Sequence, residues 1–485
     1  MCAHVAEPPT QSYFDQAIEV AKLLAIKETT RSWGGQRVPM CGFPLIHLDR
    51  HLKTLVLEKE RFVAMCEEFK RPDGTFERRV VRVITPGTLI DESFINHYEN
   101  NYLLAISPGN EGSAEVGMAW IDITTGEFFS HSMSIDGLVD DIIRIGPREV
   151  VLPTRLQDEP EHPIRRALVE SDTTMLSYTQ DPGASSKATM FETRDASSSD
   201  DLNSIPPLPR VFSPNETAAI SLVNNYLSTN LLEHMPALTS PFHENIETRM
   251  QIDAHTIKAL EIREGSREGG TTGSLLSVIK RTVTSSGTRL LARWLCELLY
   301  ICHPALTEWT SQGSPSTSIS EINARQSLVA LFVLRPHFRR DLIVQLKRIE
   351  DASRIVQKFL LGKGDTDDLL AIKYTINVWS QMKKMIELEM SMKTNQGVDD
   401  NMWKNLQLVM GRFKDLEALS SAIDSAVDEN ALRRKDEAVE EEASSVGDQP
   451  KEVVLQGPSS KFLNSKSIVW TIKSQYVIFS CITSA

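Results

Sequence analysis

The chain has 485 residues, 41% of them hydrophobic and 24% charged, as is typical of a soluble globular protein. This length exceeds what one hydrophobic core supports and favours about three domains. The net charge of −13 argues against a general nucleic-acid coat protein. No apolar run reaches the roughly 18 residues of a membrane helix, so we expect no membrane partner.

The first part of the sequence predicts a small α/β domain. Apolar residues recur at helical spacing from Ser12 to Thr29, and a turn at Trp33-Gly34-Gly35 separates this helix from the next. Beyond the turn we expect a helix at His47–Leu57 and strands at Arg61–Glu67 and Arg79–Ile84.

The next part predicts a second α/β domain. Strands are expected at Tyr102–Ile106 and Val116–Ile123, with a hairpin turn at Thr125-Gly126. A helix near Leu138–Ile145 and a strand at Glu149–Leu152 follow. Residues 181–217 are rich in Ser, Pro and Asp, which predicts a disordered insertion or a long loop.

After about Ala218 the pattern predicts helices only, and therefore an all-α domain with long elements. An acidic, polar segment follows at Asp436–Pro458. The expected helices are Leu222–Leu232, Asp253–Arg263, Leu275–Val283, Thr288–Leu298, Glu321–Leu334, Arg339–Phe359, Thr366–Met392 and Met402–Asp428.

The stretch Gly273–Leu295 carries four basic side chains and no acidic one. Two apolar stripes flank the small residues Thr284–Gly287, which predicts two packed helices. Ser285 or Ser286 is expected to cap the second helix, because a short hydroxyl can accept from the free amides at a helix start. We expect the four basic side chains of these two helices to face solvent.

Several stretches, in order along the chain, resemble the MutS family of DNA mismatch-recognition proteins. The resemblance begins in VPMCGFPLIHLDRHLKTLV (38–56) and continues in GMAWIDITTGEF (117–128) and GPREVVLP (146–153). It then extends through IDAHTIKALEI (252–262), the basic stretch, INARQSLVALF (322–332) and KRIEDASRIVQKF (347–359). The Gly-Phe-Pro and Cys-Glu-Glu-Phe variants are most similar to the fungal mitochondrial branch.

The resemblance implies a multidomain fold: two α/β domains, of mismatch-binding type and then a ribonuclease H-like connector, followed by an all-α core or lever domain. It implies duplex DNA as partner, with a homodimer or other repair proteins as further partners. It suggests a mitochondrial location, with the nucleus as the alternative. The expected ranges are 1–92 (mismatch-binding), 98–180 (connector), 181–217 (insertion), 218–245 (end of connector and link), 246–435 (core) and 436–485 (acidic linker and divergent tail).

Four departures from the family's sequence pattern limit which of its properties can be assigned to this chain. The family's Phe-x-Glu wedge is expected just before Tyr13, where this chain has Pro9-Thr10-Gln11. No stretch matches the phosphate loop that binds ATP and Mg²⁺ in the family's C-terminal domain, so we expect no enzyme and no cofactor here. Residues 297–313 interrupt the core, and the resemblance fades after about Lys473. These features suggest a truncated or mis-spliced gene product.

The candidate DNA contacts are basic. Arg31 matches a basic position in the turn after the family's first helix, and Arg37, Arg78 and Arg79 are candidates from charge alone. Residues 27–82 hold 12 Lys and Arg against 8 Asp and Glu, unlike the chain as a whole. Contacts to phosphate would give weak, salt-sensitive binding. Trp33 is expected to pack rather than to stack on a base.

Two other functions remain open. One is a helical interaction scaffold with no DNA binding of its own. The other is a metal-dependent nuclease, because Asp122 is expected on the first strand of a ribonuclease H-like pattern, near Glu127, Asp140 and Asp141. Two-metal hydrolysis needs several converging carboxylates, which makes the nuclease the weaker alternative.

Overall fold

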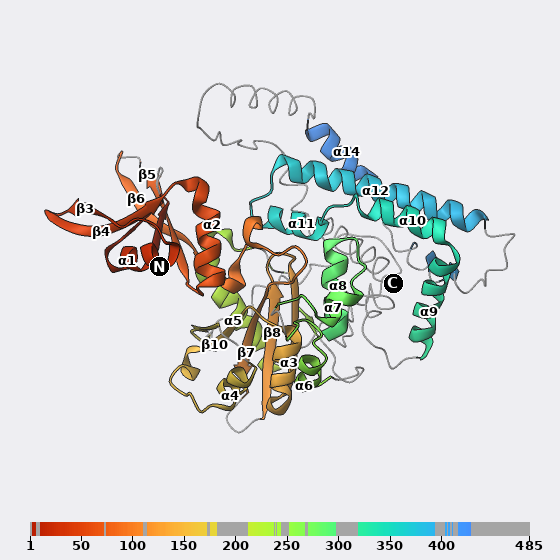
Figure 1. The fold of residues 1–485 in the computed structure, drawn as a ribbon, viewed down its shortest axis with the longest axis horizontal. Helices are drawn as coiled ribbons and strands as arrows, with labels where there is room; N and C mark the ends of the chain where they lie inside the picture. Colours follow the sequence, from red (N-terminus) through yellow and green to blue (C-terminus); the bar gives the residue numbers. More distant parts are fainter. Residues whose placement is uncertain are drawn as a thin grey trace, which may run out of the picture. The chain divides into compact units, whose positions relative to one another are not determined.

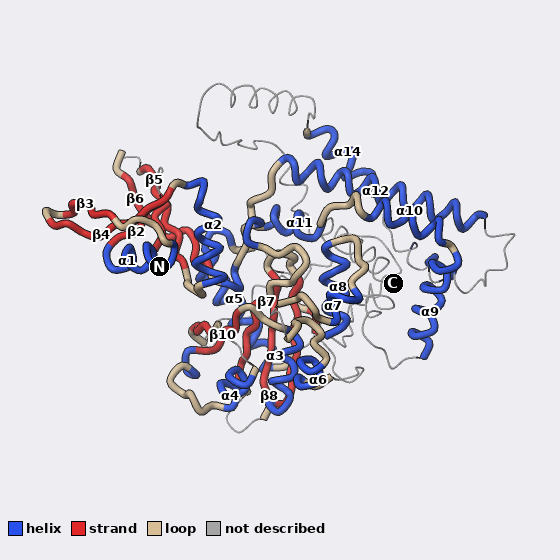
Figure 2. The backbone as a smooth tube through the Cα atoms, viewed as in Figure 1, coloured by secondary structure: helices blue, strands red, loops and turns tan. Residues whose placement is uncertain are grey.

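A computed structural model describes residues 2–5, 10–71, 74–109, 114–171, 175–181, 212–236, 238, 240–243, 252–266, 270–296, 319–392, 403–404, 406–407, 410 and 416–427. The chain divides into two compact units, one of residues 1–280 and 291–316 and the other of residues 281–290 and 317–485. The first unit contains two sheets, and the described elements of the second are helices (Figures 1 and 2). This confirms the predicted layout of two α/β domains followed by a helical region.

The N-terminal domain is built on a six-stranded sheet in the order β3-β4-β2-β1-β5-β6. Neighbouring strands run antiparallel except β1 and β5, which are parallel. Strands β3 and β6 therefore form the two opposite edges. The strands are β1 (Cys2–Val5), β2 (Thr10–Tyr13), β3 (Thr29–Trp33), β4 (Gln36–Phe43), β5 (Val63–Lys70) and β6 (Phe76–Ile84).

The first predicted helix is shorter than expected. Helix α1 (Phe14–Leu24) follows directly on β2 and ends where Ala25 adopts a left-handed conformation (φ 52°). Thr29 already belongs to β3, so the prediction was wrong at both ends. The second predicted helix is confirmed as α2 (Leu48–Lys53), which continues as a π-helical turn at Thr54–Glu58.

The β3–β4 hairpin was not predicted. Its turn is Gly34-Gly35, with both residues at positive φ (58° and 83°), as a tight two-residue hairpin turn requires. All five residues of β3 are exposed, so the strand has no alternation of apolar and polar residues. That pattern was the signal on which the strand predictions relied.

The second domain holds a sheet in the order β11-β10-β7-β8-β9-β12. The central β7, β8 and β9 are antiparallel, whereas β10, β11 and β12 each join in parallel. Three antiparallel strands extended by parallel ones on the β7 side give the expected ribonuclease H-like arrangement. The strands are β7 (Tyr102–Pro108), β8 (Glu115–Asp122), β9 (Glu127–Ser134), β10 (Glu149–Pro153), β11 (Leu176–Thr179) and β12 (Phe242–His243).

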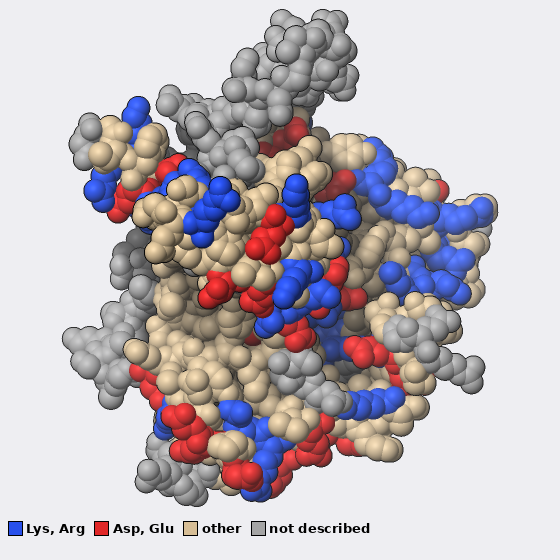
Figure 3. All heavy atoms as spheres, turned by 60° about the vertical axis from the view of Figure 1, so that its left-hand side comes forward, with Lys and Arg blue, Asp and Glu red and all other residues tan. Residues whose placement is uncertain are grey.

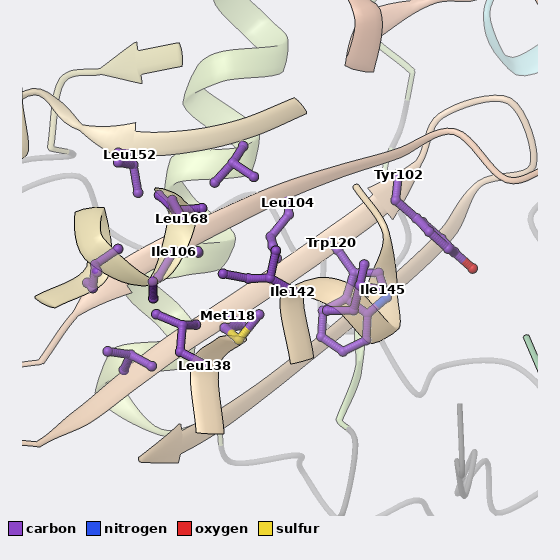
Figure 4. Packing of buried hydrophobic residues seen from close by; sticks show 14 of the residues in the cluster. Tyr102, Leu104, Ile106, Met118, Trp120, Leu138, Ile142, Ile145, Leu152 and Leu168 are labelled. Carbon is purple, nitrogen blue, oxygen red and sulfur yellow. The ribbon is translucent and has the colours of Figure 1, made fainter. Parts of the chain in front are cut away.

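Helices cover both faces of this sheet. The apolar sides of α3 (Leu138–Ile145) and α4 (Pro163–Glu170) pack on Leu104, Ile106 and Trp120 (Figure 4). Helix α5 (Pro214–Leu231) packs on the other face, against β7 and β8. There a Cβ added to Gly117 would lie 2.0 Å from the carbonyl oxygen of Asn215, so glycine permits the close approach of α5. The prediction that strands stop after Ala218 was wrong, because β12 pairs with β9.

The helical region begins in the first unit with α6 (Ala254–Ala259) and α7 (Leu275–Ile279), and α8 (Ser285–Cys296) follows. The second unit contains α9 (Ile319–Leu334), α10 (Pro336–Leu346), α11 (Ala352–Leu360), α12 (Thr366–Ser391) and α14 (Glu417–Ala426). The single helix predicted at Arg339–Phe359 is wrong, since Asp351 caps a new helix by accepting from the amide of Arg354. The predicted Met402–Asp428 helix is also interrupted, because α14 starts at Glu417 after the non-helical Leu416.

The basic stretch differs from its prediction in two ways. Thr284, not Ser285 or Ser286, caps α8, because its hydroxyl accepts from the amide of Gly287 (3.1 Å). Arg289 and Arg293 are buried rather than solvated. Arg289 donates to both carboxylate oxygens of Asp351 (2.7 and 3.2 Å), and Arg293 pairs with Glu127 (3.1 Å). Two of the four cations expected on the surface therefore form ion pairs within the fold.

Several predicted segments lie outside the described residues: most of the insertion 181–217, the odd insertion 297–313 and the acidic linker with the tail 436–485. The side chains at the expected wedge position, Pro9-Thr10-Gln11, also lie outside the described part of the chain. No helix in the described ranges combines the length and the apolar character needed to cross a membrane.

Candidate nucleic-acid interface

The four candidate arginines all lie on the sheet of the N-terminal domain, but the structure does not bring them together. Arg31 is on β3 and Arg37 on β4, at one edge, whereas Arg78 and Arg79 are on β6, at the other. Adjacent strands lie about 4.8 Å apart, so the two edges are separated by on the order of 20 Å along the sheet. The candidates form two groups rather than one basic surface.

Within the first group, Arg31 and Arg37 point to opposite faces. Arg31 pairs across the hairpin with Val38, whereas Arg37 pairs with Ser32. Side chains directly opposite each other share a face, and neighbours along a strand alternate. Both arginines are exposed. The Arg31 guanidinium donates to the phenol oxygen of Tyr13 (3.0 Å).

The second group is engaged by the protein itself. Arg78 forms an ion pair with Glu68 across the β5–β6 hairpin (3.0 Å), and the Arg79 guanidinium lies 4.0 Å from the centre of the Phe69 ring. Both contacts are near the surface and are individually weak. A phosphate would compete with Glu68 for Arg78, so this edge is the less favourable place for DNA.

The surface charge agrees with a limited contact. On the face shown in Figure 3, Lys and Arg lie among Asp and Glu rather than in one continuous basic area. On this face, binding to a DNA backbone would therefore rest on local groups of cations.

A cluster of three aromatic rings, two of them exposed, lies beside Arg31. Trp33 contacts Tyr13 edge-on (ring centres 5.4 Å apart) and Phe14 at a tilt (5.9 Å). Trp33 was expected to pack, and it does contact both rings, yet 49% of it is exposed. Sequence reasoning did not single out Tyr13 or Phe14. The available signal was the position of Trp33 just before a Gly-Gly turn, where a hairpin tip leaves little to cover a large ring.

The carboxylates of the nuclease alternative are held by protein donors. Buried Asp122 accepts from the amide and hydroxyl of Thr124 (2.9 and 2.7 Å) and from the amide of Asn101 (3.2 Å). Asp140 accepts from the amide of Ala254 (2.7 Å), and Asp141 pairs with Arg144 and His131. Among the described residues, no group of three or more His, Cys, Asp or Glu is placed to hold a metal ion. These acids act in turns and packing contacts.

A buried carboxylate lies where the two α/β domains meet within the first unit. Glu149, at the start of β10, accepts from the hydroxyl of Thr85 (2.6 Å) and the amide of Gly87 (2.8 Å), which follow β6. It also accepts from Ser177 and Tyr226. Burial and the Glu149 carboxylate raise the pKa of Tyr226, so its hydroxyl remains a donor. No pattern in the sequence analysis predicted this junction.

One stretch has some sequence similarity to a phosphate loop. This stretch, Leu361-Gly362-Lys363-Gly364, joins α11 and α12. Gly362 has a positive φ of 72°, and the Phe359 ring packs where a Cβ of Gly364 would lie. Asp365 then caps α12. The backbone amides of Leu361, Gly362 and Lys363 donate to carbonyls of the preceding helix, so they do not form the phosphate cradle that ATP needs.

Comparison with known protein families decides the relationship. MutS domain I matches residues 11–93, MutS domain II residues 101–239 and MutS domain III residues 255–474. The chain belongs to the MutS family. The sheet with the candidate arginines is thus MutS domain I, the ribonuclease H-like sheet is MutS domain II, and the helical region falls in MutS domain III.

Proteins named DNA mismatch repair protein MutS are similar to this chain. The Rhizobium meliloti protein is 31% identical over 376 residues, 74% of this chain and 38% of the relative. The Methanosarcina barkeri protein is 27% identical over 438 residues, 86% of this chain and 45% of the relative. The chain therefore spans less than half the length of these curated relatives.

Proposed function

We propose that this chain binds duplex DNA as a mismatch-repair protein of MutS type, through domain I. The observation that supports this most strongly is the match to MutS domains I, II and III in their order along the chain. The exposed Arg31 and Arg37 on the β3–β4 hairpin supply cations for phosphate. A mismatched step kinks at lower cost than a paired one, and this difference is what a protein of this type can sense.

In this proposal the binding is weak and scarcely distinguishes a single mismatch from matched DNA. Pro9, Thr10 and Gln11 occupy the positions where the family's Phe-x-Glu wedge is expected, so neither the ring nor the carboxylate is available. We also propose that the chain hydrolyses no ATP, because the Leu361–Gly364 turn does not fit a nucleotide. In this proposal, bending of the DNA would not be coupled to ATP hydrolysis by these residues.

A fluorescence titration of the full chain against matched and singly mismatched duplexes tests this function. Saturable binding of both duplexes that weakens as salt rises supports it. A preference of tenfold or more for the mismatch would contradict the weak discrimination, since that is about 1.4 kcal/mol of differential binding.

An interaction scaffold is the second candidate function. Helix α9 exposes Ile319, Val333 and Leu334, and exposed apolar groups can mark contacts between proteins. Partners would be other repair proteins or a second copy of the chain. A gel shift at about 50 mM salt separates the two functions, because the scaffold alone predicts no shifted DNA.

We propose mitochondria as the compartment, from the resemblance to the fungal mitochondrial branch, with the nucleus as the alternative. Imaging of the tagged chain expressed from its own gene distinguishes the two locations.

A further inference from the structure

We propose that Tyr13, Phe14 and Trp33 form a stacking platform for a DNA base that already lies outside the helical stack. This inference deepens the proposed function and rests on it. The platform would make the chain prefer DNA with unpaired bases, such as a bulged loop, while leaving single mismatches poorly distinguished.

The geometry of the three rings supports the platform. Phe14 and Trp33 are 52% and 49% exposed, although both are large apolar side chains. Phe14 also has a positive φ of 59°, a conformation that bulky residues rarely adopt. Strained backbone of this kind is concentrated at functional sites. Tyr13 contacts Trp33 edge-on, with ring centres 5.4 Å apart and planes at 80°.

The charge beside the rings suits a nucleotide. Arg31 and Trp33 are two residues apart on β3, so their side chains share a face of the sheet. The Arg31 guanidinium is held by the Tyr13 hydroxyl (3.0 Å) and is exposed. A base stacked on Trp33 would bring its own phosphate toward this cation. Proteins that bind unpaired strands combine an aromatic face and a cation in this way.

The platform captures unpaired bases rather than creating them. The rings come from the end of β2, the start of α1 and the end of β3 and contact one another, whereas a wedge must enter between paired bases. Extruding a paired base costs more than stacking on one aromatic surface returns, but a looped base has little stacking left to lose. A mismatch that remains within the helix therefore gains little from these rings.

The test uses the full chain and three labelled duplexes of one sequence: matched, with one G–T mismatch, and with a bulge of several thymines. Anisotropy titration should show that the bulged duplex binds about tenfold more tightly than the other two. Trp33→Leu keeps the apolar contacts but removes the flat ring, and should abolish this preference. Trp33→Phe should retain most of it.

Phe76→Ala is the matched control, because Phe76 is a 63% exposed aromatic at the opposite edge of the same sheet and should leave the preference unchanged. Equal affinity of the natural chain for all three duplexes would overturn the platform while leaving DNA binding in place. Preference retained in Trp33→Leu would overturn it as well. Failure of all three duplexes to bind would instead refute the proposed function.

Discussion

At the scale of single residues, the most consequential side chain outside the β3–β4 hairpin is Glu149. Its fully buried carboxylate has four donors from both α/β domains: Thr85, Gly87, Ser177 and Tyr226. All of these donors are neutral. Hydrogen bonds to a charged group are stronger than those between neutral groups, so a single acid can fix the chain where it passes from β6 toward β7.

We predict that Glu149→Gln lowers the free energy of unfolding of the first unit by about 2 kcal/mol. The amide keeps one acceptor but turns an NH₂ group toward hydroxyl and amide donors. Urea unfolding measures the loss, with the exposed Glu159→Gln as control. A change in Glu149→Gln no larger than in the control would mean that the junction is held by packing alone.

The lowered pKa of Asp141 leads to a prediction of how the stability of the fold depends on pH. Burial alone would raise the pKa of this carboxyl, but Arg144 and the hydrogen bond with His131 hold it well below its ordinary value of 3.8. A depressed pKa in the folded state stabilises the fold above the unfolded value, and this contribution is lost as the pH falls below it. We predict that Asp141→Asn is less stable than the natural chain near neutral pH and that the difference shrinks between about pH 5 and pH 2. Urea midpoints across this range test it; a constant difference would contradict it.

At the scale of elements, the ion pair between α8 and the start of α11 links two helices of the core. Burial alone would raise the pKa of Asp351, but the Arg289 guanidinium lowers it, so the acid stays ionised. Asp351 also caps α11 and accepts from the Ser285 hydroxyl (3.0 Å). Removing the cation would leave a buried charge beside a helix start.

We therefore predict that Arg289→Met destabilises the helical unit by about 3 kcal/mol. The exposed Arg281→Met, from the same basic stretch, should change stability by less than about 0.5 kcal/mol. Thermal unfolding followed by circular dichroism measures both. Equal effects of the two substitutions would show that the buried pair contributes nothing specific.

Elements were predictable where burial imposed a period on the sequence. Helix α3 is buried along one stripe, whereas the connector strands β7 and β8 are buried on both faces and read as nearly continuous apolar runs; the ranges of all three were nearly as predicted. The β3–β4 hairpin is exposed, and β12 has two residues, so neither carries a period. The break before α11 falls at Asp351, which caps the helix locally and also accepts from Arg289, 62 positions away.

The candidate site was predictable only in part for the same reason. Charge could nominate Arg31 and Arg78, but only the strand order places them at opposite edges of the sheet. Trp33 was visible as a residue, whereas its contacts with Tyr13 and Phe14 depend on β2 and β3 both lying beside β4. The pairing of strands that are distant in the sequence decides which residues are neighbours, and this pairing cannot be derived from composition.

At the scale of the whole molecule, a net charge of −13 favours DNA binding through a few local cations rather than through the surface as a whole. Each neutralised phosphate releases counterions and contributes about −0.9 to the slope of log affinity against log salt. With Arg78 and Arg79 engaged by Glu68 and Phe69, we expect Arg31 and Arg37 to carry most of the contact, and hence a slope of about −2. Affinities for matched duplex over a range of salt concentrations measure this slope.

Arg31→Gln together with Arg37→Gln should bring the slope close to zero, whereas Arg78→Gln with Arg79→Gln should leave it nearly unchanged. A steeper slope, about −5 or beyond, would mean that basic residues far from this hairpin also reach the DNA.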